Sequence, residues 1–424
     1  MILRQDILER VLQDLVVAEL NELRRGKHRG QAQSILTPHD ESLDSFELYT
    51  AAAAVSIMFH VHETGLEDLL LARPRPQDWV DILQRSLNES GNRMSFRSSG
   101  STGGKTLHEH QVSDLMQEVE YFASTLGRVA RVVATVPSHH IYGFLFTALL
   151  PSRMDIPVID ARGPAAITRR YAAGDLLVSF PFALERMLHF GSLPGEDVTI
   201  LCSTAPCPPE LAAAIRAQGA ELVEIYGSSE TAGVGIRREN GKPYSLLPYL
   251  ERASSTKAAE PTALIRRENR PLEQGRNPYA QRVIHLPDEV EWCDSRSFRP
   301  LRRRDGAVQV GGVNVYPDKV CELVKRHPMV AAAAVRPYVT KDGLRLKAFV
   351  VPRTAQGAVA STGPADSGST GRSTDTSEAN TSEIEQQLRE LLSAQLEAAA
   401  LPAVYTFGTE IPRNELGKLS DWQV

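Results

Sequence analysis

The sequence predicts an α/β fold in two parts. Between about residues 50 and 240, helical stretches alternate with short apolar runs that are rich in Val and Ile and bounded by Gly, Pro or Ser. Such runs are typical of strands buried between helices. A second α/β-like unit begins near residue 300, and a sharp shift in composition interrupts it after residue 353.

The clearest elements of the first part are one helix and a set of buried strands. Apolar residues at helical spacing predict an amphipathic helix over residues 2–23. The strands are predicted at residues 129–136, 176–180, 198–202 and 221–225. Residues 252–282 are polar and lead to no assignment.

The second part mixes strands and helices. Its pattern predicts, in order, a strand or hairpin, a helix, a strand, another strand and a final helix at residues 307–315, 319–326, 331–337, 344–351 and 383–399. Residues 354–381 are almost entirely Ser, Thr, Gly, Ala, Asp and Pro. Because this composition supplies no packed core, the segment is predicted to be a flexible linker or surface loop.

Size and charge exclude several classes of protein. The chain has 424 residues, of which 42% are hydrophobic and 23% charged. At ~150 residues per domain, this length predicts two or three domains. A net charge of −5 excludes a chain-wide polybasic surface for nucleic acid and a strongly acidic disordered protein. The longest apolar stretches, such as residues 51–59, are far shorter than the ~20 residues that cross a bilayer.

The N-terminus and the cysteines favour a cytoplasmic protein. Charged residues recur every few positions from Arg4 onward, which is unlike a secretory signal. The four cysteines fit no zinc pattern and are expected to be reduced thiols: Cys202, Cys207, Cys293 and Cys321.

The segment from Ser98 to Thr106 is a candidate phosphate site. Its small residues let a backbone approach a ligand closely, its hydroxyls and N–H groups can surround phosphate oxygens, and Lys105 adds a positive charge. It is not a Walker A loop, because position 99, where that loop needs its first Gly, is Ser. An ordinary Gly/Ser linker remains the alternative.

A second candidate follows the predicted strand at 221–225. Tyr226 can stack on a flat ring, and Glu230 can hold a Mg²⁺ ion that accompanies phosphates. The alternative is a simple turn from strand to loop with a solvated glutamate.

Three further segments carry less specific signals. His139 and His140 follow a predicted strand, but no third metal ligand lies at a suitable spacing, so a structural hydrogen-bonding role is the alternative. The arginines at 302–304 precede Asp305 and Gly306 and resemble a charged hinge turn. Residues 412–418, taken alone, form a polar tail with an exposed lysine.

Together, the order and spacing of these segments resemble the adenylate-forming superfamily of acyl-CoA synthetases, aryl-acid ligases and peptide-synthetase adenylation domains. The resemblance extends from about residue 95 to 420. It implies a large N-terminal adenylate-forming domain over residues 1–303, with buried sheets between helices. It also implies a small mobile α+β C-terminal domain over residues 304–424.

The resemblance implies a role for each matched residue. Catalysis is assigned to Lys418, His140 and Glu230, with Glu230 also binding the metal. The phosphates of ATP are assigned to Ser99, Gly100, Ser101, Thr102, Gly103 and Lys105. Its adenine is assigned to Ala205, Pro206 and Tyr226, and its ribose to Asp288 and Arg303. Gly227, Ser228 and Ser229 are assigned to cofactor binding. A passage for the thiol is assigned to Gly311 and Gly312, the hinge to Asp305, and the acid pocket to Tyr142, Gly143, Phe144, Ala232 and Gly233.

The sequence also departs from the family pattern. The phosphate loop is one residue shorter than usual before Lys105, Ser229 stands in place of Thr, and Arg302 in place of Gly. Asp288, preceded by Leu-Pro, stands in place of the family's Thr-Gly-Asp. The region ahead of the phosphate loop is short, as it is in the compact 4-coumarate–CoA ligases associated with photoactive yellow protein.

The implied activity is an ATP-dependent carboxylic acid–CoA ligase that forms AMP and pyrophosphate through an acyl-adenylate. Its acid would be an aryl acid such as 4-coumarate, and its cofactors ATP, Mg²⁺ and coenzyme A. One alternative acceptor is the phosphopantetheine arm of a carrier protein. Another alternative is a non-catalytic nucleotide-binding paralogue. Neither nucleic acid nor membrane is expected as a partner.

Overall fold

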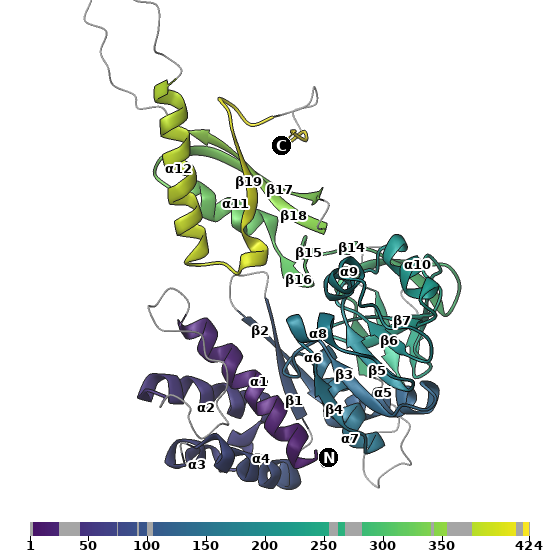
Figure 1. Ribbon diagram of the computed structural model, residues 1–424. Helices are drawn as coiled ribbons and strands as arrows, with labels where there is room; N and C mark the ends of the chain where they lie inside the picture. The colour runs from purple at the N-terminus through teal and green to yellow at the C-terminus, as the bar shows by residue number, and fades with distance from the viewer. Residues whose placement is uncertain are drawn as a thin grey trace, which may run out of the picture. The chain divides into compact units, whose positions relative to one another are not determined.

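The computed structural model describes residues 3–24, 43–73, 75–90, 93–99, 105–253, 262–267, 282–340, 343–353, 375–412 and 419–423. The chain divides into two compact units, Met1–Asp305 and Gly306–Val424. This division falls two residues beyond the predicted boundary, and the functions expected of the two parts stay predictions. Figure 1 shows each unit as a mixture of helices and sheets, so the predicted α/β class is confirmed.

Helices make up the N-terminal region of the first unit: α1 (Gln5–Arg24), α2 (Ser45–Phe59), the short 3-10 helix η1 (Val61–Glu63), α3 (Glu67–Ala72) and α4 (Pro76–Ser90). Helix α1 confirms the predicted amphipathic helix and buries the apolar stripe that contains Ile7, Val11 and Leu20. Asp44 caps α2 by accepting from the backbone N–H groups of its first turn. A buried ion pair of 2.8 Å between Arg24 Nε and Glu47 Oε1 ties α1 to α2.

A hairpin of β1 (Arg93–Ser99) and β2 (Lys105–Gln111) follows, with Ser99 opposite Lys105 in its register. Strand β1 contacts α2, and β2 leads into α5 (Val112–Thr125). The expected phosphate segment therefore begins on one strand and ends on the other. Its central residues, 100–104, lie outside the described residues, as do the side chains of Ser99 and Lys105.

The first unit is organised around a nine-stranded sheet in the order β13-β14-β9-β8-β7-β6-β5-β3-β4. Its parallel half consists of β3 (Arg131–Ala134), β4 (Val158–Asp160), β5 (Asp175–Ser179), β6 (Thr199–Cys202) and β7 (Glu221–Ser228). These include all the strands predicted for the first part. From β7 onward the pairing is antiparallel, through β8 (Ala232–Arg237), β9 (Tyr244–Leu246), β14 (Ser297–Arg303) and β13 (Asp288–Trp292).

The parallel strands are buried on both faces. Successive residues of a strand point to opposite sides of a sheet. Accordingly, Leu176 and Val178 lie in one apolar cluster and Leu177 lies in another. The connecting helices are α6 (Ile141–Phe144), the π-helix η2 (Leu145–Leu149), α7 (Leu150–Met154), α8 (Pro164–Thr168), α9 (Pro181–His189) and α10 (Pro209–Ala217).

A small separate sheet lies in the region that the sequence left unassigned. Its strands are β10 (Leu250–Arg252), β11 (Ala263–Arg266) and β12 (Arg282–His285), all antiparallel. Across the described residues of the whole chain, no helix is long and apolar enough to span a membrane.

The second unit has its own sheet and core. The hairpin of β15 (Val308–Val310) and β16 (Val313–Val315) precedes α11 (Pro317–Lys325). A three-stranded sheet contains β17 (Val330–Thr340), β18 (Gly343–Pro352) and β19 (Pro402–Phe407), with α12 (Asp375–Ser393) and the 3-10 helix η3 (Ala398–Ala400) between the last two. Ile384, Leu388 and Leu392 of α12 are buried in this core.

Two predicted boundaries in the second unit are wrong. Residues 375–381, expected in the flexible segment, belong to α12, and the helix ends at Ser393 rather than Ala399. The Ser-, Thr- and Gly-rich composition of the whole segment concealed this start of the helix. Residues 354–374 lie outside the described residues.

Candidate active site

The candidate site centres on the turn that joins β7 to β8. The backbone N–H of Ser228 donates to Thr231 Oγ1 at 3.2 Å, and the N–H of Thr231 donates to the carbonyl oxygen of Ser228 at 3.3 Å. A Cβ atom at Gly227 would lie 2.3 Å from the carbonyl oxygen of Ala232. The turn therefore requires glycine at position 227.

Glu230 in this turn lies in a charged cluster with Arg303 and Asp305. Arg303 Nη2 lies 3.2 Å from Glu230 Oε1 and 2.7 Å from Asp305 Oδ2. Burial alone would lower the pKa of Arg303, but the contacts with Asp305 and Glu230 outweigh it and raise that pKa. Burial alone would raise the pKa of Glu230, yet hydrogen bonds from Ser228 and its own amide, with the charge of Arg303, lower it. Both groups are therefore charged at neutral pH.

Asp288 pairs with the other end of the same turn. The hydroxyl of Tyr226 donates to Asp288 Oδ2 at 2.7 Å, and Asp288 is opposite Arg303 in the β13–β14 register. Burial raises the pKa of Asp288, against the lowering effects of the Tyr226 hydrogen bond and the Arg303 charge. Burial and the neighbouring Asp288 raise the pKa of Tyr226 as well. Within the described part of the chain, the buried Asp288 Oδ1 has no hydrogen-bond partner.

Two histidines of β2, which the sequence did not single out, also face this turn. His110 Nε2 donates to the carbonyl oxygen of Ser229 at 2.7 Å, and His108 Nε2 lies 2.7 Å from Ser98 Oγ on β1. Burial lowers the pKa of His108, the charge of Glu230 opposes this, and the charge of Arg303 adds to it. Their spacing of two residues places both side chains on one face of a strand, but no strand was predicted there.

The loop after β6 approaches the same turn. Ser203 Oγ donates to the carbonyl oxygen of Ile225 at 2.8 Å. Next to it, Thr204 has a φ of 75°, a left-handed conformation that is strained for a β-branched residue. Of the expected adenine residues that follow, Ala205 is half-buried and Pro206 is exposed.

The expected acid-pocket residues of α6 are held tightly. The hydroxyl of Tyr142 donates to the carbonyl oxygens of Ser179 (3.1 Å) and Leu201 (2.9 Å), at the ends of β5 and β6. A Cβ atom at Gly143 would lie 1.9 Å from the carbonyl oxygen of Pro137. Phe144 is fully buried, with its ring 5.3 Å from that of Phe96. His140 immediately precedes the helix, and its ring lies 4.2 Å from that of His139.

A buried carboxyl group, also missed in the sequence, fixes the start of β8. The backbone N–H of Gly233 donates to Glu118 Oε2 at 2.9 Å, and a Cβ atom at Gly233 would lie 2.2 Å from Glu118 Oε1. Burial raises the pKa of Glu118 to about 7, although Arg266 and the Gly233 amide act in the opposite direction. Ala232, its neighbour on β8, has a left-handed φ of 59°.

The structure thus brings together Tyr226, Glu230, Asp288, Arg303 and Asp305 in the first unit. Gly311 and Gly312 lie in the second unit, where positive φ angles of 57° and 85° form the turn between β15 and β16. Lys418 lies outside the described residues. The roles assigned to all of these residues by resemblance stay predictions.

Two solved structures of synthetases share the fold of this chain. The o-succinylbenzoate CoA synthetase of Bacillus subtilis aligns with a TM-score of 0.55 and 19% identity, over 77% of this chain and 67% of its own. The amide bond synthetase of Marinactinospora thermotolerans aligns with a TM-score of 0.55 and 19% identity, over 78% and 68%. These two likenesses define the class of fold to which the chain belongs.

Curated relatives define the family more closely. The 4-coumarate–CoA ligase of Halorhodospira halophila is 33% identical over 98% of this chain and 99% of its own length. The 4-coumarate–CoA ligase of Cereibacter sphaeroides is 32% identical over 99% and 97%. The chain belongs to the 4-coumarate–CoA ligase family, which confirms the resemblance in the sequence. No protein-family model matches the chain.

Replacement of Glu118 by Gln tests its buried carboxyl group. A carboxyl group whose pKa is raised on folding binds a proton more tightly in the folded chain, so it lowers stability as pH rises from its ordinary pKa towards about 7. Glutamine does not titrate and can still accept from Gly233. The melting temperature of E118Q minus that of the wild type should therefore increase between about pH 5 and about pH 8.

The matched control is E120Q on the same helix, where the side chain pairs with Arg153 at the surface. The melting temperature of E120Q minus that of the wild type should show no comparable rise with pH, because exposed ion pairs contribute little to stability. A flat or falling difference in melting temperature for E118Q would show that folding does not raise the pKa of the buried carboxyl group.

Proposed function

We propose that the protein is an ATP-dependent carboxylic acid–CoA ligase that forms an acyl-adenylate and acts on an aryl acid such as 4-coumarate. The observation that carries this proposal is the cluster in which Tyr226 pairs with Asp288 while Arg303 links Glu230 to Asp305. The cluster lies at the carboxyl end of β7, beside the point where the sheet changes from parallel to antiparallel. In open α/β sheets, ligands bind at such strand ends.

The residues present fit a nucleotide. Asp288 Oδ1 is a buried acceptor without a partner in the described structure, and a ribose hydroxyl would satisfy it. Arg303 pairs with Asp288 in the strand register and can donate to the same sugar or to a phosphate. Ser203–Pro206 and Tyr226 would border the adenine. Ser99 to Lys105 would hold the outer phosphates.

Charge neutralisation is the main task of the first half-reaction. A carboxylate oxygen of the acid attacks the α-phosphorus of ATP, the bond to the bridging oxygen breaks, and pyrophosphate leaves. Glu230, whose pKa its hydrogen bonds and the charge of Arg303 lower, would hold Mg²⁺, which supplies positive charge to the phosphates. Lys418 would lie between the acid and the α-phosphate, and His140 would border the acid.

The second half-reaction transfers the acyl group to a thiol. The sulfur of coenzyme A attacks the acyl carbon, the bond from that carbon to the AMP oxygen breaks, and AMP leaves. The left-handed turn at Gly311 and Gly312 gives a backbone without side chains against which a pantetheine arm can lie. We infer that the small domain turns about Asp305, so that this turn replaces Lys418 at the reaction centre.

The acid pocket is best suited to a flat, largely apolar acid. The polar group of Tyr142 is already engaged by two backbone carbonyls, and the neighbouring Phe144 is apolar and buried. Curated relatives at 33% and 32% identity are named for 4-coumarate, which supports this acid as the substrate.

The first test is mass spectrometry of thioesters formed from a mixed panel. Aromatic, cinnamic and fatty acids are supplied together with ATP, Mg²⁺ and coenzyme A. We expect 4-coumaroyl-CoA to dominate. AMP release without any thioester would favour a carrier-protein acceptor instead, and absence of both products would favour a non-catalytic paralogue.

Lys418→Ala tests the two-step use of the small domain. We expect adenylate formation to fall by at least ~100-fold, as for loss of a group that stabilises transition-state charge. Thioester formation from supplied acyl-adenylate and coenzyme A should stay near the wild-type rate. Lys325→Ala, at an exposed position of α11, should change neither rate. Equal losses in both half-reactions for Lys418→Ala would refute the domain rotation.

A further inference from the structure

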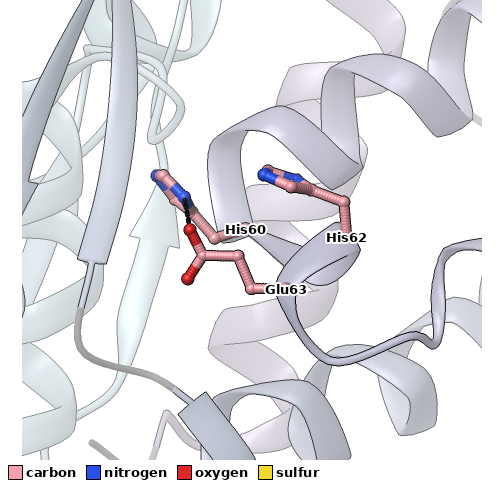
Figure 2. A group of neighbouring side chains, drawn as sticks. All are labelled: His60, His62 and Glu63. Carbon is pink, nitrogen blue, oxygen red and sulfur yellow. Dashed lines mark hydrogen bonds and ion pairs between the residues drawn. The ribbon is translucent and has the colours of Figure 1, made fainter.

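A cluster of potential metal ligands lies in the turn after α2, on elements that the proposed reaction does not use. His60 has a left-handed φ of 53°, which ends α2 and starts the short helix η1. His60, His62 and Glu63 then project from this turn toward one another (Figure 2). His60 Nδ1 lies 3.0 Å from Glu63 Oε1, and the two imidazole rings are 5.5 Å apart.

We propose that His60, His62 and Glu63 bind a divalent transition-metal ion of the zinc class. One ligand atom from each of the three side chains lies within 4.8 Å of the others. Two imidazoles and one carboxylate are a ligand set that zinc uses when a fourth position is left to water. Tetrahedral bonds of ~2.1 Å place ligand atoms roughly 3.4 Å apart, so His62 would have to move inward by about an ångström or somewhat more. This movement is feasible because His62 is exposed.

The surroundings of His60 hold its ring in the orientation that a metal requires. Its other nitrogen, Nε2, lies 3.0 Å from Ser95 Oγ, and both residues are only 7% exposed. A ring that donates from Nε2 to this hydroxyl turns the lone pair of Nδ1 toward Glu63. Metal-binding histidines usually have such an outer hydrogen bond.

The positive charge of Arg93 would repel a metal ion bound to Glu63. Arg93 also contacts a second carboxylate, that of Glu109. Arg93 Nη2 contacts Glu63 Oε1, while Nη1 contacts Glu109 Oε1 at 3.1 Å. The Arg93 side chain is 38% exposed, so its ion pairs are weak. Among the described residues, the contacts of Glu63 all use Oε1. Oε2 is therefore available to a metal while Arg93 keeps Glu109.

Metal binding would connect two parts of the first unit. His60 and Glu63 follow α2, whereas Ser95 and Arg93 belong to β1, the strand that leads into the expected phosphate segment. An ion bound to the folded chain and not to the unfolded chain raises stability. A rise in melting temperature is therefore a second readout, which is independent of enzyme activity.

The test is titration calorimetry of the metal-stripped full chain with ZnCl₂, in buffer containing millimolar Mg²⁺. We expect one zinc ion per chain with a dissociation constant in the micromolar range or below, and a zinc-dependent rise in melting temperature. His62→Ala should weaken binding by at least ~10-fold and abolish the thermal shift. His62 is exposed and ends no helix, so this variant should fold.

His189→Ala is the matched control, because His189 is an exposed histidine of α9 in the same unit. It should bind zinc as the wild type does. Glu63→Gln, which keeps the size of the side chain but not its charge, should also weaken binding. Absence of stoichiometric zinc in the wild type, or unchanged affinity in His62→Ala, would overturn the proposal.

Discussion

The site depends on one close approach between two backbones, at the point where the sheet changes from parallel to antiparallel. Gly227 lies so near the carbonyl oxygen of Ala232 that no side chain fits between them. This contact lets β7 reverse into β8 within a few residues. Tyr226 and Glu230 are therefore held at opposite ends of one short turn. Asp288 and Arg303 reach them from a strand pair that joins the sheet much later in the chain.

The buried ionisable groups around that turn are stabilised in two ways. Glu230, Arg303 and Asp305 neutralise one another by direct contact. Glu118 and Asp288 instead have raised pKa values, because burial outweighs their favourable contacts. A charged cluster that is already paired is preorganised, since its members need little rearrangement to meet the charges of a ligand. Burial also leaves Asp288 Oδ1 without a hydrogen-bond partner among the described residues.

The buried parallel strands could be predicted from the sequence, whereas the strands with polar residues could not. Strands β3, β5, β6 and β7 are buried on both faces, so they read as continuous apolar runs. Strands β2, β13 and β14 carry charged or polar residues such as His108, Glu291 and Arg302, and no such run exists. Asp288 and Arg303 could be placed only by family resemblance. His110 and Glu118 were missed because their partners lie far away in the sequence, and His108 was missed because no strand was predicted there.

The close contacts of three glycines limit which substitutions this part of the first unit can accept. At position 143 the backbone of Pro137 occupies the place of a side chain, and at position 227 the backbone of Ala232 does so. Substituting a neighbouring side chain therefore makes no room at either position. Position 233 differs, because its neighbour is the carboxyl group of Glu118. A larger residue at 233 becomes possible only with a smaller residue at 118. A substitution at this position is therefore a coupled, two-site change rather than a single step.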